Sequence, residues 1–221
     1  MSIDIASHAA ELPAKTILLK EVSVDPDGVY AFDFDGVLST SDEDDIYHLE
    51  SWEDEEALLD RAARTLNINC GGMELKYRRH LLFQASAYVI GMPIQAGTAL
   101  PLAREVANAG RLFVITARSG WQAVERMRHF LISHAIVPVE AFNLGRVRKD
   151  RQIDLLCREF PNRQIFYVED NVAHLAAVDV LDHRNLSLIW APRAAERRPE
   201  AELREMVRDV IGQAITRSEA A

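Results

Sequence analysis

The sequence predicts an α/β fold in which a parallel sheet carries helices on both faces. Four segments are apolar on both alternating faces, as strands buried between two layers are, at 29–34, 111–116, 164–169 and 186–190. Helical patterns alternate with these strands, at about 98–109, 119–134, 149–160 and 171–182. Strands that alternate with helices form parallel sheets through right-handed crossovers.

Three further segments complete the expected main domain, which comprises residues 1–41 and 93–221. The segment 16–24 has the composition of an edge strand, and 141–147 that of a short strand. An amphipathic helical pattern follows near 196–217. We expect this last helix to pack on the sheet, with pairing between two copies of the chain as the alternative.

Residues 42–92 interrupt the alternation directly after the first strand. Two helical patterns, at 53–67 and 73–90, are separated there by Cys70-Gly71-Gly72. A pair of helices at this point does not belong to a simple strand–helix–strand unit. We therefore interpret 42–92 as a small α-helical cap that stands over the carboxyl end of the first strand.

Composition and charge narrow the class of protein. The formal net charge of -9 argues against non-specific nucleic-acid binding by the protein as a whole, so a nucleic-acid partner is not expected. Two cysteines, Cys70 and Cys157, are too few for a disulfide framework or a four-cysteine zinc site. No apolar stretch approaches the ~20 residues of a membrane span, and the first residues lack a secretory signal pattern. We expect a cytoplasmic monomer or homodimer that does not bind membranes.

Polar side chains follow the ends of the predicted strands. Strand residues two apart point the same way, so Asp33 and Asp35 are expected to lie side by side. Because ligands bind outside the carboxyl ends of parallel strands, the candidate site residues should converge there. They are Asp33, Asp35, Thr116, Ala117, Arg118, Glu169 and Asp170, with Lys149 at the start of a helix.

Each of these residues also has a purely structural interpretation. Asp33 and Asp35 can simply precede an Asp-Gly turn and face water. Asp170 or Asn171 can cap the helix that begins at Val172, and Lys149 can be a surface lysine. Their combined order, each after its own strand, is far more specific than any one of them.

That order resembles the haloacid dehalogenase superfamily of phosphohydrolases, whose core is Rossmann-like. "DFDGVLS" (33–39) is similar to its first motif and "VITAR" (114–118) to its second. Lys149 in "RVRKDRQ" matches the third, and "FYVEDN" (166–171) resembles the acidic fourth. The resemblance covers about 29–190, and the family inserts its cap between the first and second motifs. Three arginines compete with Lys149 for the third position, namely Arg146, Arg148 and Arg151.

The resemblance implies a mechanism and a set of ligands. Asp33 would attack phosphorus and form an aspartyl-phosphate, and Asp35 would act as general acid and base. Mg2+ would be held by the side chains of Asp33 and Asp170 and by the main-chain carbonyl of Asp35. Glu169 would hold a metal-bound water or orient Lys149. Substrate contacts would come from Thr116, Ala117, Arg118 and Lys149.

The resulting hypothesis is a Mg2+-dependent phosphatase that hydrolyses a small phosphomonoester. Three alternatives stay open: a phosphotransferase or mutase, a polynucleotide or nucleotide end-phosphatase, and a catalytically silent binding module on the same scaffold. In the predicted cap, the basic cluster Lys76, Arg78, Arg79 and His80 is either a solvated helix face or a set of substrate contacts.

Overall fold

The computed structural model describes residues 12–40, 42–118, 120–145, 147–193 and 198–221. The described residues fall into two compact units. The sheet unit takes its residues from 1–41, 95–118 and 131–196, and the helical unit from 42–94, 119–130 and 197–221. The expected cap segment, 42–92, lies within the helical unit, and its function as a cap stays a prediction.

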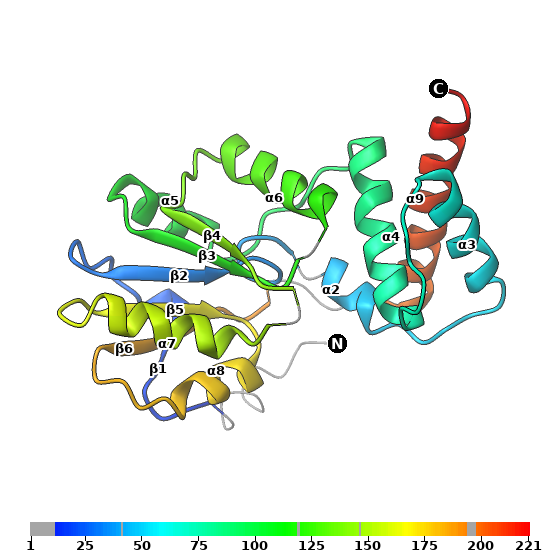
Figure 1. Ribbon diagram of the computed structural model, residues 1–221. Coiled ribbons are helices and arrows are strands. Elements are labelled where there is room, and N and C mark those ends of the chain that lie inside the picture. Colours follow the sequence, from blue (N-terminus) through cyan, green and yellow to red (C-terminus); the bar gives the residue numbers. More distant parts are fainter. Residues whose placement is uncertain (1–11, 41, 119, 146, 194–197) are drawn as a thin grey trace. The chain divides into compact units, whose positions relative to one another are not determined.

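The sheet unit is built on a six-stranded sheet in which every neighbouring pair of strands is parallel (Figure 1). Its spatial order is β1-β6-β5-β2-β3-β4. The strands are β1 (Thr16–Leu18), β2 (Val29–Asp33), β3 (Leu112–Thr116), β4 (Glu140–Asn143), β5 (Ile165–Glu169) and β6 (Leu186–Trp190). This parallel, Rossmann-like α/β architecture confirms the predicted fold class.

The buried strands explain why the sheet forms. Every residue of β2 and of β3 is buried, as a central strand covered on both faces requires. On one face, Ala31 lies in a core cluster with Ile153 of α7 (Lys149–Glu159) and Leu175 of α8 (Val172–Asp179). The alternate residue Phe32 points to the other face and is equally buried, and α5 (Leu100–Asn108) packs against β3.

The strand order places a topological switch point at β2. From β2 the chain continues outward to β3 and β4 and then returns to β5, on the other side of β2. In open α/β sheets, ligands bind outside the carboxyl ends of the strands at such a reversal. The carboxyl ends of β2 and β5 carry Asp33 and Glu169, so the topology brings two of the candidate acids together.

A tight loop follows β2. The amides of Leu38 and Ser39 both donate to the carbonyl of Phe34, at 3.0 and 2.8 Å, and Gly36 has φ +83°, which favours glycine. The loop is held from outside by Gly97, whose amide donates to the carbonyl of Leu38 at 2.8 Å. A Cβ at position 97 would lie only 2.3 Å from the carbonyl oxygen of Val37.

Replacing Gly97 by Ala is therefore expected to destabilise the protein by ~1–3 kcal/mol, the usual effect of overpacking a rigid contact. The atoms that would have to move are backbone atoms, which cannot rotate away. Urea denaturation measures the loss. Gly212→Ala is the control: an added Cβ there meets nothing within 4 Å, and alanine in a helix is expected to be neutral or stabilising. Equal stabilities for the Gly97→Ala variant and the wild type would contradict the contact.

The helical unit has its own core. It contains α2 (Asp42–Tyr47), α3 (Glu55–Thr65), α4 (Leu75–Ile90) and α9 (Glu200–Glu219), together with the first part of α6 (Trp121–Ser133). The apolar stripe of α9 packs against α3 and α4, whose ribbons lie beside it in Figure 1. The stripe consists of Leu203, Val207, Val210, Ile211 and Ile215.

The position of α9 corrects one expectation. The amphipathic segment near 196–217 was expected to pack on the sheet, but its buried face is occupied by Leu59 of α3 and Phe83 of α4, among others. Its amphipathic pattern shows that one face is covered and carries no information about the partner that covers it. Among the described helices, none combines the length and apolar character needed to cross a membrane.

Candidate functional site

Three buried carboxylates converge at the carboxyl ends of β2 and β5. One oxygen from each of Asp33, Glu169 and Asp170 lies within 4.8 Å of the others. The register explains this, because Phe32 pairs with Val168 across the two parallel strands and the next residues are Asp33 and Glu169. Each of the two strands ends in an acidic residue, and the parallel pairing places these two residues side by side.

Lys149 joins two of these carboxylates. Its Nζ lies 2.7 Å from Asp33 Oδ2 and 3.0 Å from Glu169 Oε2. Burial by itself lowers the pKa of Lys149, but the carboxylates of Asp33 and Glu169 outweigh burial and raise the pKa above its ordinary value. Lys149 is the first residue of α7, and its neighbour Arg148 is exposed and paired with Asp150. Arg151 is also exposed, whereas Arg146 lies outside the described residues.

Glu169 is fully engaged within the protein. Its Oε1 accepts hydrogen bonds from the amides of Asp170 and Asn171, both at 3.1 Å. Its Oε2 contacts Lys149 Nζ, accepts from the Tyr167 hydroxyl and lies 3.3 Å from His174 Nδ1. Burial acts to raise the pKa of Glu169, but Lys149 and His174 prevail and hold it well below the ordinary value. With both oxygens occupied, Glu169 is suited to fixing the position of Lys149.

Asp170 is held from two directions. Arg193 donates from Nε to Asp170 Oδ2 at 2.6 Å, and Trp190 donates from Nε1 to the main-chain carbonyl of Asp170 at 3.1 Å. Gly36 provides the space that the carboxylate occupies, because a Cβ at position 36 would lie 2.3 Å from Asp170 Oδ2. The glycine in "DFDG" therefore has a second function besides its positive φ.

The cluster carries an excess of negative charge. Burial raises the pKa of Asp33 well above its ordinary value, and Glu169 adds to the rise while Lys149 opposes it. Burial and the charge of Glu169 likewise raise the pKa of Asp170 to about 8, against the influence of Arg193. The negative charge of both carboxyls is therefore disfavoured, because the neighbouring cations only partly offset burial and the charge of Glu169.

These residues fit a divalent cation with a preference for oxygen. Mg2+ is typically bound through one or two carboxylates together with water and phosphate oxygens. Asp33 and Asp170 offer carboxylates whose raised pKa values reflect burial and the nearby charge of Glu169, and a divalent cation would favour their charged forms. Since the oxygens of Glu169 already accept several hydrogen bonds, Asp33 and Asp170 are the residues that would hold the ion.

Asp35 takes a different direction from Asp33. β2 ends at Asp33, so the alternation that would set Asp33 and Asp35 side by side ends there, and Asp35 is not part of the carboxylate cluster. Arg118 instead holds Asp35 through two hydrogen bonds, from Nε to Oδ2 at 3.1 Å and from Nη2 to Oδ1 at 2.7 Å.

The expected contact of Arg118 with substrate stays a prediction, and in the structure its side chain is buried and bound to Asp35. The side chain is 1% exposed, and the guanidinium carbon lies 4.7 Å from the centre of the Phe34 ring. The amide of Arg118 donates to Thr116 Oγ1 at 3.1 Å. Arg118, the last residue of the segment that begins at Thr116, therefore holds Asp35 in position.

Thr116 ends β3 on the same edge of the sheet, and Ala117 directly follows it. Thr116 is buried, whereas Ala117 is exposed and lines a hollow of about 270 Å³. Lys149 and His174 also line this hollow, so an open space borders the lysine of the site. Its size suits a small group rather than a large ligand.

Three contributing residues were missed by sequence reasoning: Tyr167, His174 and Arg193. Tyr167 is two residues before Glu169 on the same strand, so its orientation toward Glu169 follows from the alternation along β5. Arg193 follows the carboxyl end of β6, the place where polar residues gather in such a sheet. His174 lies in the first turn of α8 and carries no comparable signal.

The residues of the basic cluster in the expected cap have different surroundings. Arg79 is buried and paired with Glu55, and Arg78 is paired with Asp60. Lys76 stays exposed above the ring of Tyr77. Within the described residues of this cluster, the two arginines thus have carboxylate partners on α3.

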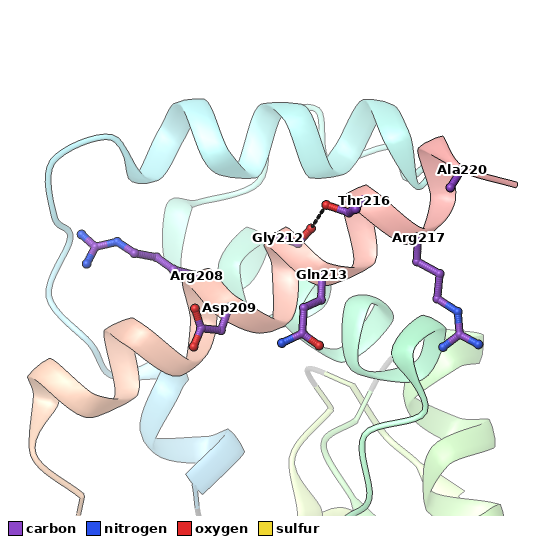
Figure 2. A pocket seen from close by; sticks show the side chains of 7 residues that line it. All are labelled: Arg208, Asp209, Gly212, Gln213, Thr216, Arg217 and Ala220. Carbon is purple, nitrogen blue, oxygen red and sulfur yellow. Dashed lines mark hydrogen bonds between the residues drawn. The ribbon is translucent and has the colours of Figure 1, made fainter.

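A second hollow, of about 520 Å³, lies on the helical unit and has no comparable chemistry. Its seven lining residues all belong to α9 or directly follow it, between Arg208 and Ala220 (Figure 2). In the close view, Gln213 and Arg217 project from the helix without converging on a common point. A surface formed by a single helix in this way provides no enclosed binding site.

Comparisons with known proteins add little to this geometry. No family model matches the chain, and no curated protein matches it. Among solved structures, a "putative haloacid dehalogenase-like hydrolase" from Burkholderia xenovorans LB400 is similar, with 17% identity and a TM-score of 0.46. The match covers 74% of this chain and 81% of that one. The functional argument therefore rests on the residues of the site.

Proposed function

We propose that the protein is a Mg2+-dependent phosphatase that hydrolyses a small phosphomonoester through a covalent intermediate on Asp33. The observation that carries this proposal is the buried cluster of Asp33, Glu169 and Asp170 with Lys149 bound to Asp33. The cluster lies at the switch point of a parallel sheet, where such folds bind ligands. The order of the four sequence motifs supports the same activity.

Asp33 is suited to act as the nucleophile. One of its oxygens accepts a hydrogen bond from the Phe34 amide at 2.7 Å, which fixes the carboxylate at the end of the strand. In the first step, a carboxylate oxygen forms a bond to phosphorus while the bond from phosphorus to the substrate oxygen breaks. In the second, water attacks the same phosphorus and the aspartyl oxygen is released with both electrons of the bond.

The main obstacle is electrostatic repulsion. Two unit negative charges 4 Å apart repel by ~4 kcal/mol at an effective dielectric constant of 20, and the phosphate carries more than one. When bound, Mg2+ would neutralise part of this charge. Lys149 contributes a positive charge beside Asp33, and its position is fixed by Glu169. Thr116, buried at the end of β3, would donate its hydroxyl to a phosphate oxygen.

Asp35 would move the protons. It would donate one to the leaving oxygen in the first step and accept one from the attacking water in the second. The two hydrogen bonds from Arg118 keep its carboxyl in one orientation. Arg118 is therefore a positioning residue in this proposal, and substrate contact is left to Thr116, Ala117 and Lys149.

Asp35→Asn is expected to lower steady-state turnover by ~10²–10⁴-fold while leaving the first step partly active. Asparagine cannot exchange the proton, so hydrolysis of the intermediate should fail more severely than its formation when the leaving group is good. Acid quenching with a radiolabelled substrate should therefore trap more phosphoenzyme than in the wild type. Asp182→Asn, at an exposed position with φ +48° that asparagine adopts readily, is the control. An unchanged steady-state rate for Asp35→Asn would remove its assignment as acid and base.

The activity itself is tested with a panel of sugar phosphates, nucleotides and phosphorylated polynucleotide ends, with Mg2+ or with a chelator. We expect Mg2+-dependent release of inorganic phosphate from at least one small phosphomonoester. Product analysis separates hydrolysis from transfer to a second alcohol, and a preference for polynucleotide ends would favour the end-phosphatase alternative. No turnover of any compound, together with no binding of Mg2+, would support the catalytically silent alternative.

A further inference from the structure

We infer that Arg193 occupies the place of the cation on Asp170 in the metal-free protein and competes with Mg2+ for that carboxylate. This inference rests on the proposed Mg2+ site and goes beyond it, because it assigns a function to a residue outside the four motifs. The contact is direct, with Arg193 Nε donating to Asp170 Oδ2 at 2.6 Å.

The arginine is placed by a framework that does not depend on the ion pair. The segment after β6 is tied to the segment after β5, because the amide of Ala191 donates to the carbonyl of Glu169 at 3.0 Å. Trp190 Nε1 donates to the carbonyl of Asp170, and the Thr98 hydroxyl donates to the carbonyl of Pro192 at 3.4 Å. The segment from Trp190 to Pro192, which precedes Arg193, is thereby held beside Asp170.

The two carboxylates that would hold Mg2+ have different partners. Asp33 is paired with Lys149, whose side chain is 10% exposed and is also fixed by Glu169. Arg193 is paired with Asp170, and its side chain is 30% exposed. A guanidinium with access to solvent loses less on being displaced than a buried ammonium does, so Arg193 is the cation that can leave.

Geometry limits what Asp170 can bind at one time. Its Oδ2 faces Arg193 and also lies where a Cβ of residue 36 would be, so the carboxylate is enclosed by Gly36 on that side. A divalent ion on the carboxylate would meet the guanidinium as a second cation at close range. Displacement of the arginine relieves that repulsion, and we therefore expect the binding of Mg2+ to weaken or break this ion pair.

The charge of Asp170 is therefore compensated both in the metal-free protein and in the Mg2+-bound protein. Without metal, Arg193 compensates a buried acid whose charge would otherwise stay unbalanced. With metal, the ion takes over that compensation and the arginine is released. The arginine thus lowers the affinity for Mg2+ and at the same time preserves the site when Mg2+ is absent.

The test compares Mg2+ binding by the full chain and by its Arg193→Gln variant, using calorimetry after removal of metal with a chelator. We expect the variant to bind Mg2+ about threefold to tenfold more tightly, the range set by partly exposed charged hydrogen bonds. Arg158→Gln is the matched control, since it removes the same charge from an exposed pair with Asp154. It should bind Mg2+ as the wild type does. Arg193→Lys, which keeps the charge, should lie nearer to the wild type.

Thermal unfolding gives a second readout that a merely structural arginine would not produce. Arg193→Gln should unfold at a lower temperature than the wild type without Mg2+, and the rise in Tm on adding Mg2+ should be larger in the variant. Asp170→Asn should abolish that rise, which shows that the ion binds at this site. A lower Tm with an unchanged or weaker affinity for Mg2+ would overturn the competition and leave the phosphatase proposal intact. An absence of Mg2+ binding in every variant would overturn both.

Discussion

Replacing Asp33 by Asn is expected to abolish phosphoryl transfer, with a loss of about 10⁴-fold or more in kcat, the scale at which removal of a catalytic nucleophile acts. The amide of asparagine is a poor nucleophile and cannot form the aspartyl-phosphate. Turnover of the best substrate from the panel is the measurement. Trapping of phosphoenzyme by acid quenching is the second, and none should be found in the variant.

The same substitution should leave the protein folded. Burial and Glu169 disfavour the negative charge of Asp33, as its raised pKa indicates, and removing that charge offsets the loss of the ion pair with Lys149. Lys149 keeps Glu169 as its carboxylate partner in the variant. The asparagine oxygen can still accept the hydrogen bond from the Phe34 amide. A thermal unfolding curve close to that of the wild type is therefore expected. Retention of near-normal Mg2+-dependent turnover would show that another residue is the nucleophile.

Replacing Arg79 by Met is expected to lower the free energy of unfolding by ~3–5 kcal/mol, the usual cost of leaving one member of a buried ion pair without its partner. Arg79 and Glu55 are both buried, and Arg79 Nη2 lies 3.2 Å from Glu55 Oε2. Its Nη1 also donates to the carbonyls of Ile46 and Leu49, at 3.1 and 2.7 Å. The variant leaves the carboxylate and both carbonyls without this donor.

Urea denaturation measures this effect, and two further variants sharpen it. Arg61→Met removes an arginine from an exposed pair with Glu219 in the same unit and should cost no more than ~1 kcal/mol. The double variant Arg79→Met, Glu55→Gln should be more stable than Arg79→Met alone, because no buried charge is left. An unchanged stability with a raised KM would instead favour substrate contact, the other interpretation of the basic cluster.

Much of the sheet unit could be predicted from the sequence, because its signals are local. The strands expected at 29–34, 111–116, 164–169 and 186–190 correspond to β2, β3, β5 and β6. Apolar residues on both faces identify a buried strand without knowledge of its neighbours. Lys149 was expected to start a helix, as it starts α7. The rule for ligand sites in parallel sheets then selects the ends of these strands.

The two edge strands of the sheet were predicted less accurately than the central strands, for a physical reason. The edge strand expected at 16–24 is only the three residues of β1, and the short strand expected at 141–147 is Glu140–Asn143. Edge strands have one neighbour and a partly exposed face, so their sequences are less constrained. A similar lack of constraint explains why the packing partner of α9 was predicted wrongly. Its apolar stripe would fit a sheet as well as it fits the helices α3 and α4.

By itself, the sequence determined which residues stand at the ends of the buried strands. The apolar runs that identify these strands, and the turn after Asp35, are patterns of neighbouring residues in the chain. Only the tertiary structure decided how the charges are paired. Arg118 binds Asp35, Arg193 binds Asp170, and Lys149 bridges Asp33 and Glu169. Each pair joins residues that are at least 20 positions apart in the sequence, and electrostatic attraction acts through space, so the partner of a charge is set by the fold and not by its position in the chain.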